Sequence, residues 1–181
     1  YMKKYLKYSM LLFCFYALVI MAEKETISNL EANSQIELLY SNIYTTQLSI
    51  DVKSFKLEEI VNNSDKYKVS IQYGTSILDV GMPDIPKLST SIIIPDDLNM
   101  ALSIISYDYT DYDNVEIAPS KGNLNRNIIP EEIPFSYGDI YKIDAFYPGN
   151  LAEIGEPYIL RDLRGTRVIF YPIQYNPYTK T

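Results

Sequence analysis

The sequence predicts an all-β domain built as an antiparallel β-sandwich. Two runs, Gln47–Lys53 and Lys66–Tyr73, alternate apolar and polar residues with a period of two, which is the pattern of a strand with one solvated face. Further short β-type runs follow, and clusters of turn-forming residues separate them at short intervals. Few stretches show helical periodicity, so two packed sheets are the expected architecture.

The first 22 residues have the pattern of a secretory signal peptide. Lys3, Lys4 and Lys7 precede an apolar block that ends at Ala22, and polar residues follow at once. The block is shorter than the roughly 20 apolar residues that a membrane-spanning helix needs. A membrane anchor that is never removed is the alternative. We expect a secreted or cell-surface protein that contacts the membrane only transiently through its signal peptide.

The expected organisation is a signal peptide over residues 1–22, a flexible lead-in over 23–44 and a β-sandwich over 45–181. Loss of the leader would remove three lysines and no acidic residue, so the formal net charge would change from −7 to −7 − 3 = −10. Such an acidic domain lacks the clustered cations that bind phosphate, which argues against a nucleic-acid partner.

The chain has few residue types that support covalent catalysis or metal binding. It contains no histidine, and its one cysteine, Cys14, lies in the predicted leader. Cys–His and Ser–His–Asp catalysis and the usual zinc ligand sets are therefore excluded for the exported part. The sequence predicts no catalytic residue, no cofactor and no metal site.

The middle of the chain continues the succession of strands. Gly81–Pro86 is expected to be a rigid connector, because each of its prolines fixes φ and lacks a backbone donor. Two strands are expected next, Ser91–Ile94 and Ala101–Tyr107, on either side of a turn at Pro95–Asn99. The second of these runs is rich in apolar residues, which predicts a strand buried on much of both faces.

The last third, Val115–Thr181, holds seven of the ten prolines. They punctuate short β-type runs such as Tyr158–Leu163 and Val168–Ile173. This part also carries a basic loop, Ser120–Asn127, and a basic turn, Arg161–Arg167, inside an otherwise acidic protein.

Four ordered motifs in this part indicate a family. They are APSKG at Ala118–Gly122, FYPG at Phe146–Gly149, EPYILRDLRG at Glu156–Gly165 and QYNPYTKT at Gln174–Thr181. Together they resemble the N-terminal propeptide of gingipain-type cysteine peptidases, which belong to the caspase-like clan. The resemblance implies a jelly-roll-like β-sandwich. It also implies further strands beyond the QYNP motif, so we expect a fragment of a longer precursor that lacks its C-terminal strands.

The resemblance also implies a role for the basic loop. The family presents a basic residue from this loop to the specificity pocket of its own peptidase, and the matching residue here is Arg126. A guanidinium can donate two parallel hydrogen bonds to a pocket carboxylate, which a lysine cannot do. Lys121 is the second candidate for this contact. The alternative is a solvated surface arginine without a partner.

Arg161 and Arg164 could belong to a face that docks on the peptidase. The alternative is a hairpin turn at Gly165 whose arginines pair with nearby acids, namely Asp162, Asp144, Glu153 or Glu156, and such surface pairs contribute little energy.

Two other patterns could bind ligands. Asp108, Asp111, Asp113 and Glu116 supply oxygens that calcium prefers, but they lack the glycine-turned loop of a calcium motif, and a solvated acidic turn is the alternative. The 18 tyrosines could stack sugars or form a binding face, although aromatic residues are also favoured in strands.

The leading hypothesis for function is the pro-region of a secreted gingipain-like cysteine endopeptidase precursor. It would act in cis as an inhibitor and folding aid of the cognate peptidase domain and be removed on activation. A secreted β-sandwich binding module, either carbohydrate-binding or adhesive, is the alternative. A third possibility attaches the domain to a related surface-processing peptidase.

Overall fold

The computed structural model describes residues 33–60, 63–98 and 100–181, and in residues 63 and 64 only the backbone. The predicted leader and the first part of the lead-in lie outside these residues. Within them, no helix has the length and apolar character needed to cross a membrane.

The described part is built from short strands and two turns of 3₁₀ helix. In chain order they are β1 (Asn33–Ser41), β2 (Thr46–Ser54), β3 (Lys56–Ile60), β4 (Asn63–Ser70), β5 (Thr75–Ser76), β6 (Pro86–Ile93), η1 (Pro130–Glu132), η2 (Asp139–Lys142), β7 (Ala152–Ile154), β8 (Tyr158–Leu160) and β9 (Leu163–Phe170). The prediction of an all-β domain is confirmed.

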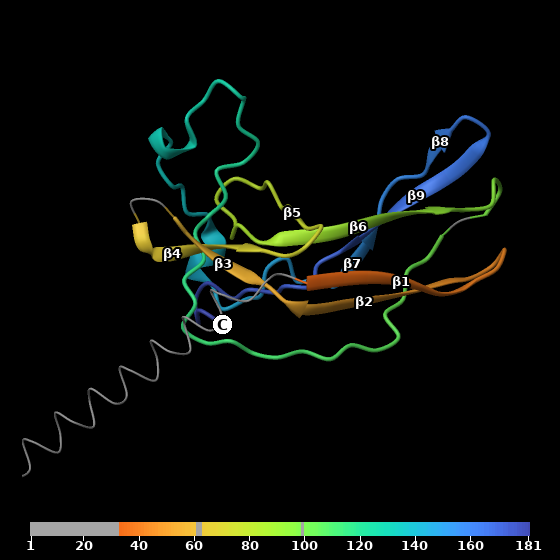
Figure 1. Cartoon of the computed structure of the whole chain (residues 1–181), viewed down its shortest axis with the longest axis horizontal. Helices are drawn as coiled ribbons and strands as arrows, with labels where there is room; N and C mark the ends of the chain where they lie inside the picture. The colour runs from red at the N-terminus through yellow and green to blue at the C-terminus, as the bar shows by residue number, and fades with distance from the viewer. Residues whose placement is uncertain (1–32, 61–62, 99) are drawn as a thin grey trace, which may run out of the picture.

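The strands form two layers (Figure 1). One layer contains two antiparallel pairs, β1–β2 and β3–β4. The other is a sheet with the order β5-β6-β9-β7, in which β8 also pairs with β9. The central ladder pairs β6 with β9 from Leu88↔Phe170 to Ile93↔Gly165, so it joins segments that are far apart in the sequence.

The predicted strand at Gln47–Lys53 corresponds to β2. The predicted strand at Lys66–Tyr73 overlaps β4 from Lys66 to Ser70, whereas residues 71–73 lie in no strand. In β4, Tyr67 and Val69 are buried while Lys66 and Lys68 lie between buried and exposed, which matches the alternation in the sequence. Ser91–Ile94 is the end of a longer strand, β6, that already begins at Pro86.

Two expectations about secondary structure were wrong. Ala101–Tyr107 forms no strand, and every residue in it is exposed instead of buried. It pairs with no other described strand, and an apolar run without a partner edge cannot form a ladder. Residues 33–41, within the expected flexible lead-in, form β1 because they pair with β2.

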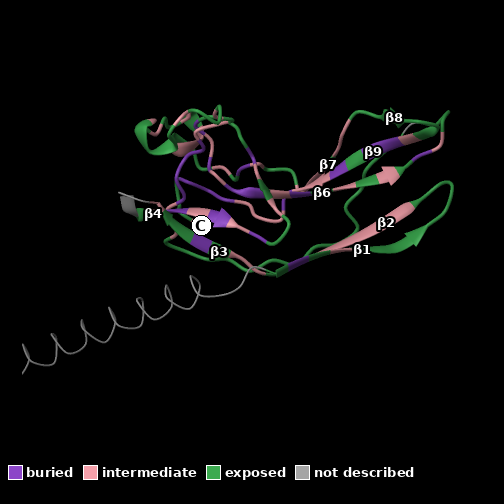
Figure 2. Cartoon of the chain, turned by 45° about the horizontal axis from the view of Figure 1, so that its top comes forward, coloured by how far each residue is buried: buried purple, intermediate pink, exposed green. Residues whose placement is uncertain are grey.

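The hydrophobic core lies at one end of the sandwich (Figure 2). It contains side chains from β3, β4 and the connecting segments: Leu57, Tyr67, Val69, Ile77, Ile85, Ile117, Tyr147, Tyr171 and Tyr175. The tips of the β1–β2 and β8–β9 hairpins are exposed in the same view. The core therefore supports the part of the domain from which the basic loop emerges.

Candidate functional site

The basic loop emerges from a buried and strongly hydrogen-bonded base. Residues 117–120 are all buried, and Pro119 is among the side chains with the least exposed surface. Ala118 N–H donates to the Tyr67 carbonyl at 2.9 Å, and Ser120 N–H donates to the Met82 carbonyl at 2.7 Å. The Ala118 carbonyl accepts from Asp84 N–H at 2.9 Å. The chain is thus fixed by β4 and by the 81–86 connector before the loop begins.

In the structure the basic loop extends from Ser120 to Gly138, and the same connector holds its end. Gly138 N–H donates to the Gly81 carbonyl at 2.9 Å, and Gly81 N–H donates to the Ser120 carbonyl at 3.0 Å. Gly81 has a φ of +81°, and a Cβ built on it would lie 3.1 Å from the Gly138 nitrogen. Glycine is therefore required here by both the backbone conformation and the close approach of a second chain segment.

Between these fixed ends, Arg126 lies in a tight turn. Ile128 N–H donates to the Asn125 carbonyl at 3.0 Å, which places Arg126 and Asn127 at the two central positions of a β-turn. Both residues are exposed. The Arg126 guanidinium makes no ion pair or hydrogen bond with any residue that the structure describes. Its donors are therefore available to a ligand.

Lys121, in contrast, is used within the loop. Its ammonium donates to the Pro130 carbonyl at 2.7 Å and lies 4.3 Å from the centroid of the Phe135 ring. Both contacts cross the loop from its beginning to its end, so they hold its two arms together. The structure thus separates the two candidate residues: Lys121 braces the loop and Arg126 is presented by it.

A charge cluster lies beside the base of the loop. Glu116 accepts from the Lys180 ammonium at 2.8 Å and lies 3.2 Å from the Lys66 ammonium. Lys66 also hydrogen-bonds to the Tyr137 hydroxyl. The hydrogen bond from Lys180 lowers the pKa of Glu116, and the hydrogen bond from Lys66 acts in the same direction. Desolvation acts in the opposite direction but does not outweigh them. The cluster connects β4, the end of the loop and the C-terminal segment.

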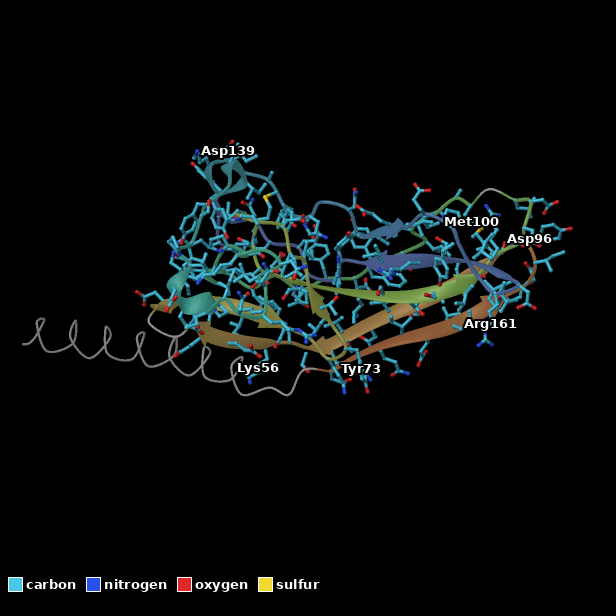
Figure 3. All side chains as sticks on the ribbon, turned by 90° about the horizontal axis from the view of Figure 1, so that it is seen from above. Lys56, Tyr73, Asp96, Met100, Asp139 and Arg161 are labelled. Carbon is cyan, nitrogen blue, oxygen red and sulfur yellow. The ribbon has the colours of Figure 1, made fainter. Side chains whose placement is uncertain are left out.

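Arg161 and Arg164 are found in a different part of the molecule. Figure 3 shows Arg161 at the same end of the domain as Asp96 and Met100, opposite to Asp139, and Figure 1 places the tip of the β8–β9 hairpin far from the loop that precedes η2. Arg161 is exposed, with a φ of +58°, at the two-residue turn between Leu160 and Leu163. One patch on a rigid domain would not include both Arg161 and Arg126.

The expected ion pairs of these two arginines are not found. Arg164 donates through Nη1 to the carbonyls of Pro95, Asp96 and Leu98, at 2.6, 3.0 and 3.1 Å. It therefore anchors the start of the segment that follows β6. Arg161 has no ion-pair partner among the described residues. The hairpin turn lies at Arg161–Asp162, and the expectation of a turn at Gly165 was wrong.

The acidic segment does not assemble a cation site. Within the described ranges, no three residues of the His, Cys, Asp and Glu types come together in a way that could hold a metal ion. Asp113 instead accepts a hydrogen bond from the Thr181 hydroxyl at 3.2 Å.

Sequence reasoning missed two parts of the site. Phe135 was not identified as the platform for Lys121, because a cation–π contact across a loop has no fixed spacing in the sequence. Gly81 was treated only as part of a rigid connector. A signal was present, since an isolated glycine beside prolines indicates a close backbone approach.

Comparisons with known proteins agree with this architecture. The family model Propeptide_C25 matches residues 23–181. Gingipain R1 of Porphyromonas gingivalis is 36% identical over 156 residues, which are 85% of this chain and 16% of the relative. Gingipain R2 from the same organism is 34% identical over 150 residues, which are 82% of this chain and 20% of that relative. The chain thus spans only a small part of the relatives that it matches.

Solved structures give the same result. The structure described as the complex of Porphyromonas gingivalis RgpB pro- and mature domains matches with a TM-score of 0.72 and 34% identity, over 81% of this chain and 77% of that one. A second, on the zymogenic latency of gingipain K from Porphyromonas gingivalis, has a TM-score of 0.60 at 17% identity, over 82% of this chain and 91% of that one, and supports the fold alone. Because the family model covers residues 23–181, the chain belongs to the Propeptide_C25 family, that of the gingipain-type propeptides.

Proposed function

We propose that this domain is the N-terminal pro-region of a secreted or cell-surface gingipain-like cysteine endopeptidase precursor, and that it inhibits the peptidase by placing Arg126 in the specificity pocket. The partner is the cognate peptidase domain in cis, which the pro-region also helps to fold and from which it is removed on activation. The observation that carries the proposal is the exposed Arg126 guanidinium, which pairs with no residue in the described part of the chain and lies in a turn whose two arms are fixed.

Pre-organisation of the loop favours tight binding. A loop that is already ordered loses little conformational entropy when it docks. Here the base is bonded to β4 and the 81–86 connector, the end is bonded to Gly81, and Lys121 joins the arms. Covalent linkage adds a high effective concentration, because binding in cis is an intramolecular event.

The turn also gives a reason why the loop would be a poor substrate. Peptide segments that add to a protein cleft through main-chain hydrogen bonds do so as extended strands. The Arg126–Asn127 peptide bond instead lies between the two central residues of a turn closed by the 3.0 Å bond from Ile128 to Asn125. Cleavage at this bond would require the turn to unfold, and the contacts that hold the two arms of the loop oppose this change.

The proposal predicts that Arg126→Ala weakens inhibition of an arginine-specific gingipain-type peptidase by well over tenfold, because a charge-assisted bidentate contact is lost. Arg126→Lys should fall between the wild type and the alanine variant, since an ammonium keeps the charge but not the planar fork. The measurement is the inhibition constant of the purified domain added in trans, with urea unfolding to verify that each variant is folded.

Arg161→Ala is the matched control, because Arg161 is also an exposed arginine in a turn but belongs to the β8–β9 hairpin, at the other end of the domain from the basic loop. It should leave the inhibition constant within about twofold of the wild type. An inhibition constant that Arg126→Ala leaves unchanged would reject the pocket assignment, and a large effect of Arg161→Ala would assign the contact to the β8–β9 tip instead.

A further inference from the structure

The segment from Met100 to Asp111 is a long stretch of described backbone that lies outside every strand and helix. None of these residues makes a hydrogen bond with any other residue that the structure describes, and all are exposed. Exposure reaches 75% at Ile105 and 77% at Tyr109. Figure 1 shows the segment in green as an open trace that runs from the end of β6 back toward the end that holds β3 and β4.

Both ends of this segment are anchored. Before it, the Arg164 guanidinium binds the Leu98 carbonyl at 3.1 Å. After it, the Tyr112 ring packs edge-on against Phe55 with ring centroids 5.1 Å apart, and Val115 N–H donates to the Lys180 carbonyl at 3.2 Å. Between these anchors the chain can take up the extended form that a peptidase cleft binds, and unbonded exposed backbone is where folded proteins are nicked first.

The side chains of this segment set which peptidases could cut it. No lysine or arginine occurs between Lys87 and Lys121. The segment instead offers large apolar and aromatic side chains, of which Leu102, Ile105, Tyr107 and Tyr109 are exposed. A peptidase that requires a basic residue at the bond it cuts therefore has no site here, whereas one that accepts aromatic or aliphatic residues has several.

The four arginines of the chain lie on backbone that resists cleavage. Arg126 and Arg161 occupy tight turns, and Arg167 is paired in the β6–β9 ladder opposite Ser91. Arg164 is held by three backbone carbonyls. In this domain, arginine side chains and accessible extended backbone are thus found on different segments.

We propose that residues 100–112 are a processing site for a peptidase with aromatic or large aliphatic specificity, and that a peptidase specific for basic residues cannot make this cut. The step is hydrolysis of one peptide bond by water, which yields a new carboxylate and a new amine. The role of this cut in activation rests on the proposed function. The arginine-specific peptidase that the domain inhibits would not cut this segment, and a second peptidase would cut it.

The nick would not separate the domain into two pieces at once. The fragment before the cut carries β6 and the fragment after it carries β9, and these strands form the central ladder from Leu88↔Phe170 to Ile93↔Gly165. The base of the basic loop also remains bonded to β4, since Ala118 donates to Tyr67. The fragments should therefore co-elute on size exclusion and separate only in denaturant, with a stability that now depends on concentration.

The test is limited proteolysis of the protein with chymotrypsin and with trypsin, each at low ratio, and with mass spectrometry of the first fragments. Chymotrypsin should make its first cut within residues 100–112. Ser106→Arg and Ser103→Arg should each create a trypsin site in this segment that is cut at least tenfold faster than a site created by Ser89→Arg. Ser89 is also an exposed serine, but it lies in β6 opposite Ile169.

All three variants should be cut at similar rates in urea, because the comparison then depends on sequence alone. A first chymotrypsin cut outside residues 100–112 would overturn the proposal. So would equal trypsin rates for the β6 variant and the two segment variants in the folded protein. Neither outcome depends on the peptidase that Arg126 binds, so this inference and the proposed function can fail separately.

Discussion

At the scale of single residues, the position of Arg126 depends on two glycines, which have no side chain that could bind the peptidase. Gly81 and Gly138 approach each other where the 81–86 connector meets the end of the basic loop, with a 2.9 Å hydrogen bond between them. A Cβ on Gly138 would lie 3.0 Å from the Gly81 carbonyl oxygen. The contact is between two backbones, so neither side can move aside as a flexible side chain could.

Gly81→Ala should therefore lower the free energy of unfolding by about 2 kcal/mol. A positive φ costs an L-residue roughly 1–2 kcal/mol. The new methyl group would also crowd the Gly138 nitrogen and the Ser136 carbonyl oxygen, at 3.1 and 3.3 Å. Urea unfolding measures the change. Gly149→Ala is the matched control, because Gly149 has a φ of +89° but its new Cβ would only meet the Phe146 carbonyl at 3.5 Å. Equal losses in both variants would contradict the crowding at Gly81.

Arg126 also shows what a sequence can predict about a site. Glycine and asparagine around it predict an exposed turn, and the turn is found. Whether its guanidinium is free or already paired depends on which acids the fold brings near it, and no local pattern contains that information. The sequence left Lys121 as a second candidate beside Arg126, and its contacts with Pro130 and Phe135 show that its ammonium is used within the loop.

At the scale of the elements, period-two alternation predicted β2 and the Lys66–Ser70 part of β4, because each has one buried or half-buried face. It failed for Ala101–Tyr107, whose composition suits a strand but which has no partner among the described strands. Propensity describes how well a segment fits into a sheet, and pairing decides whether it joins one. The same limit explains β1. Its sequence predicted only a flexible lead-in, but residues 33–41 form a strand because they pair with β2.

The β8–β9 turn was misplaced for a related reason. Glycine predicts a turn, so Gly165 was the expected position, but Gly165 lies inside β9. A Cβ there would lie 3.2 Å from both the Tyr158 ring and the Ile92 carbonyl. The glycine is thus needed for close packing across the sheet, and the exposed Arg161 takes the left-handed turn position in its place.

The basic loop as an element makes a further prediction. Lys121→Met keeps most of the unbranched side chain but removes the terminal ammonium, and with it the hydrogen bond to Pro130 and the charge above Phe135. These contacts are worth about 1 kcal/mol together at a partly exposed site. We expect faster amide exchange over residues 121–135 and a two- to tenfold weaker inhibition constant, with global stability nearly unchanged. Under the proposed function this effect should be smaller than that of Arg126→Ala, because Lys121 would shape the loop while Arg126 enters the pocket.

Lys142→Met provides the control, since it removes an exposed ion pair with Asp139 in η2 and leaves the loop arms joined. It should change neither amide exchange in the loop nor inhibition. If Lys121→Met weakens inhibition as much as Arg126→Ala while exchange in the loop stays the same, then Lys121 itself is the pocket contact.

At the scale of the whole molecule, buried tyrosine hydroxyls connect segments that are distant in sequence. Tyr175 donates to the Val115 carbonyl at 2.9 Å, and Tyr141 donates to the Ile117 carbonyl at 3.0 Å. Tyr147 and Tyr171 donate to Asp79 and Glu153, at 3.0 and 3.1 Å. Three of these four rings belong to the hydrophobic core, so these tyrosines combine apolar packing with hydrogen bonds that satisfy polar groups.

These tyrosines predict how stability depends on alkaline pH. Desolvation, followed by the hydrogen bond to Glu153, raises the pKa of Tyr171 to about 12 from a usual value of 10.0. The pKa values of Tyr141, Tyr147 and Tyr175 are raised as well, with desolvation as the main cause. A phenol that holds its proton more tightly in the folded state stabilises that state fully below pH 10. This contribution is lost as the pH rises toward 12, because the unfolded chain ionises first.

The free energy of unfolding should therefore fall steeply between pH 10 and 12, and the absorbance of tyrosinate near 295 nm should rise together with unfolding. Tyr171→Phe removes one ionisable group but keeps the ring, so it should make this fall shallower, at the cost of a hydrogen bond at neutral pH. Tyr73→Phe is the matched control, because its ring is 82% exposed and contacts no part of the core cluster. Lysines also lose their protons in this range, but they are the same in both variants and cannot produce a difference between them. If the two variants show identical slopes, the alkaline loss of stability does not come from the buried phenols, and the tyrosine hydroxyls do not couple the distant segments of this domain.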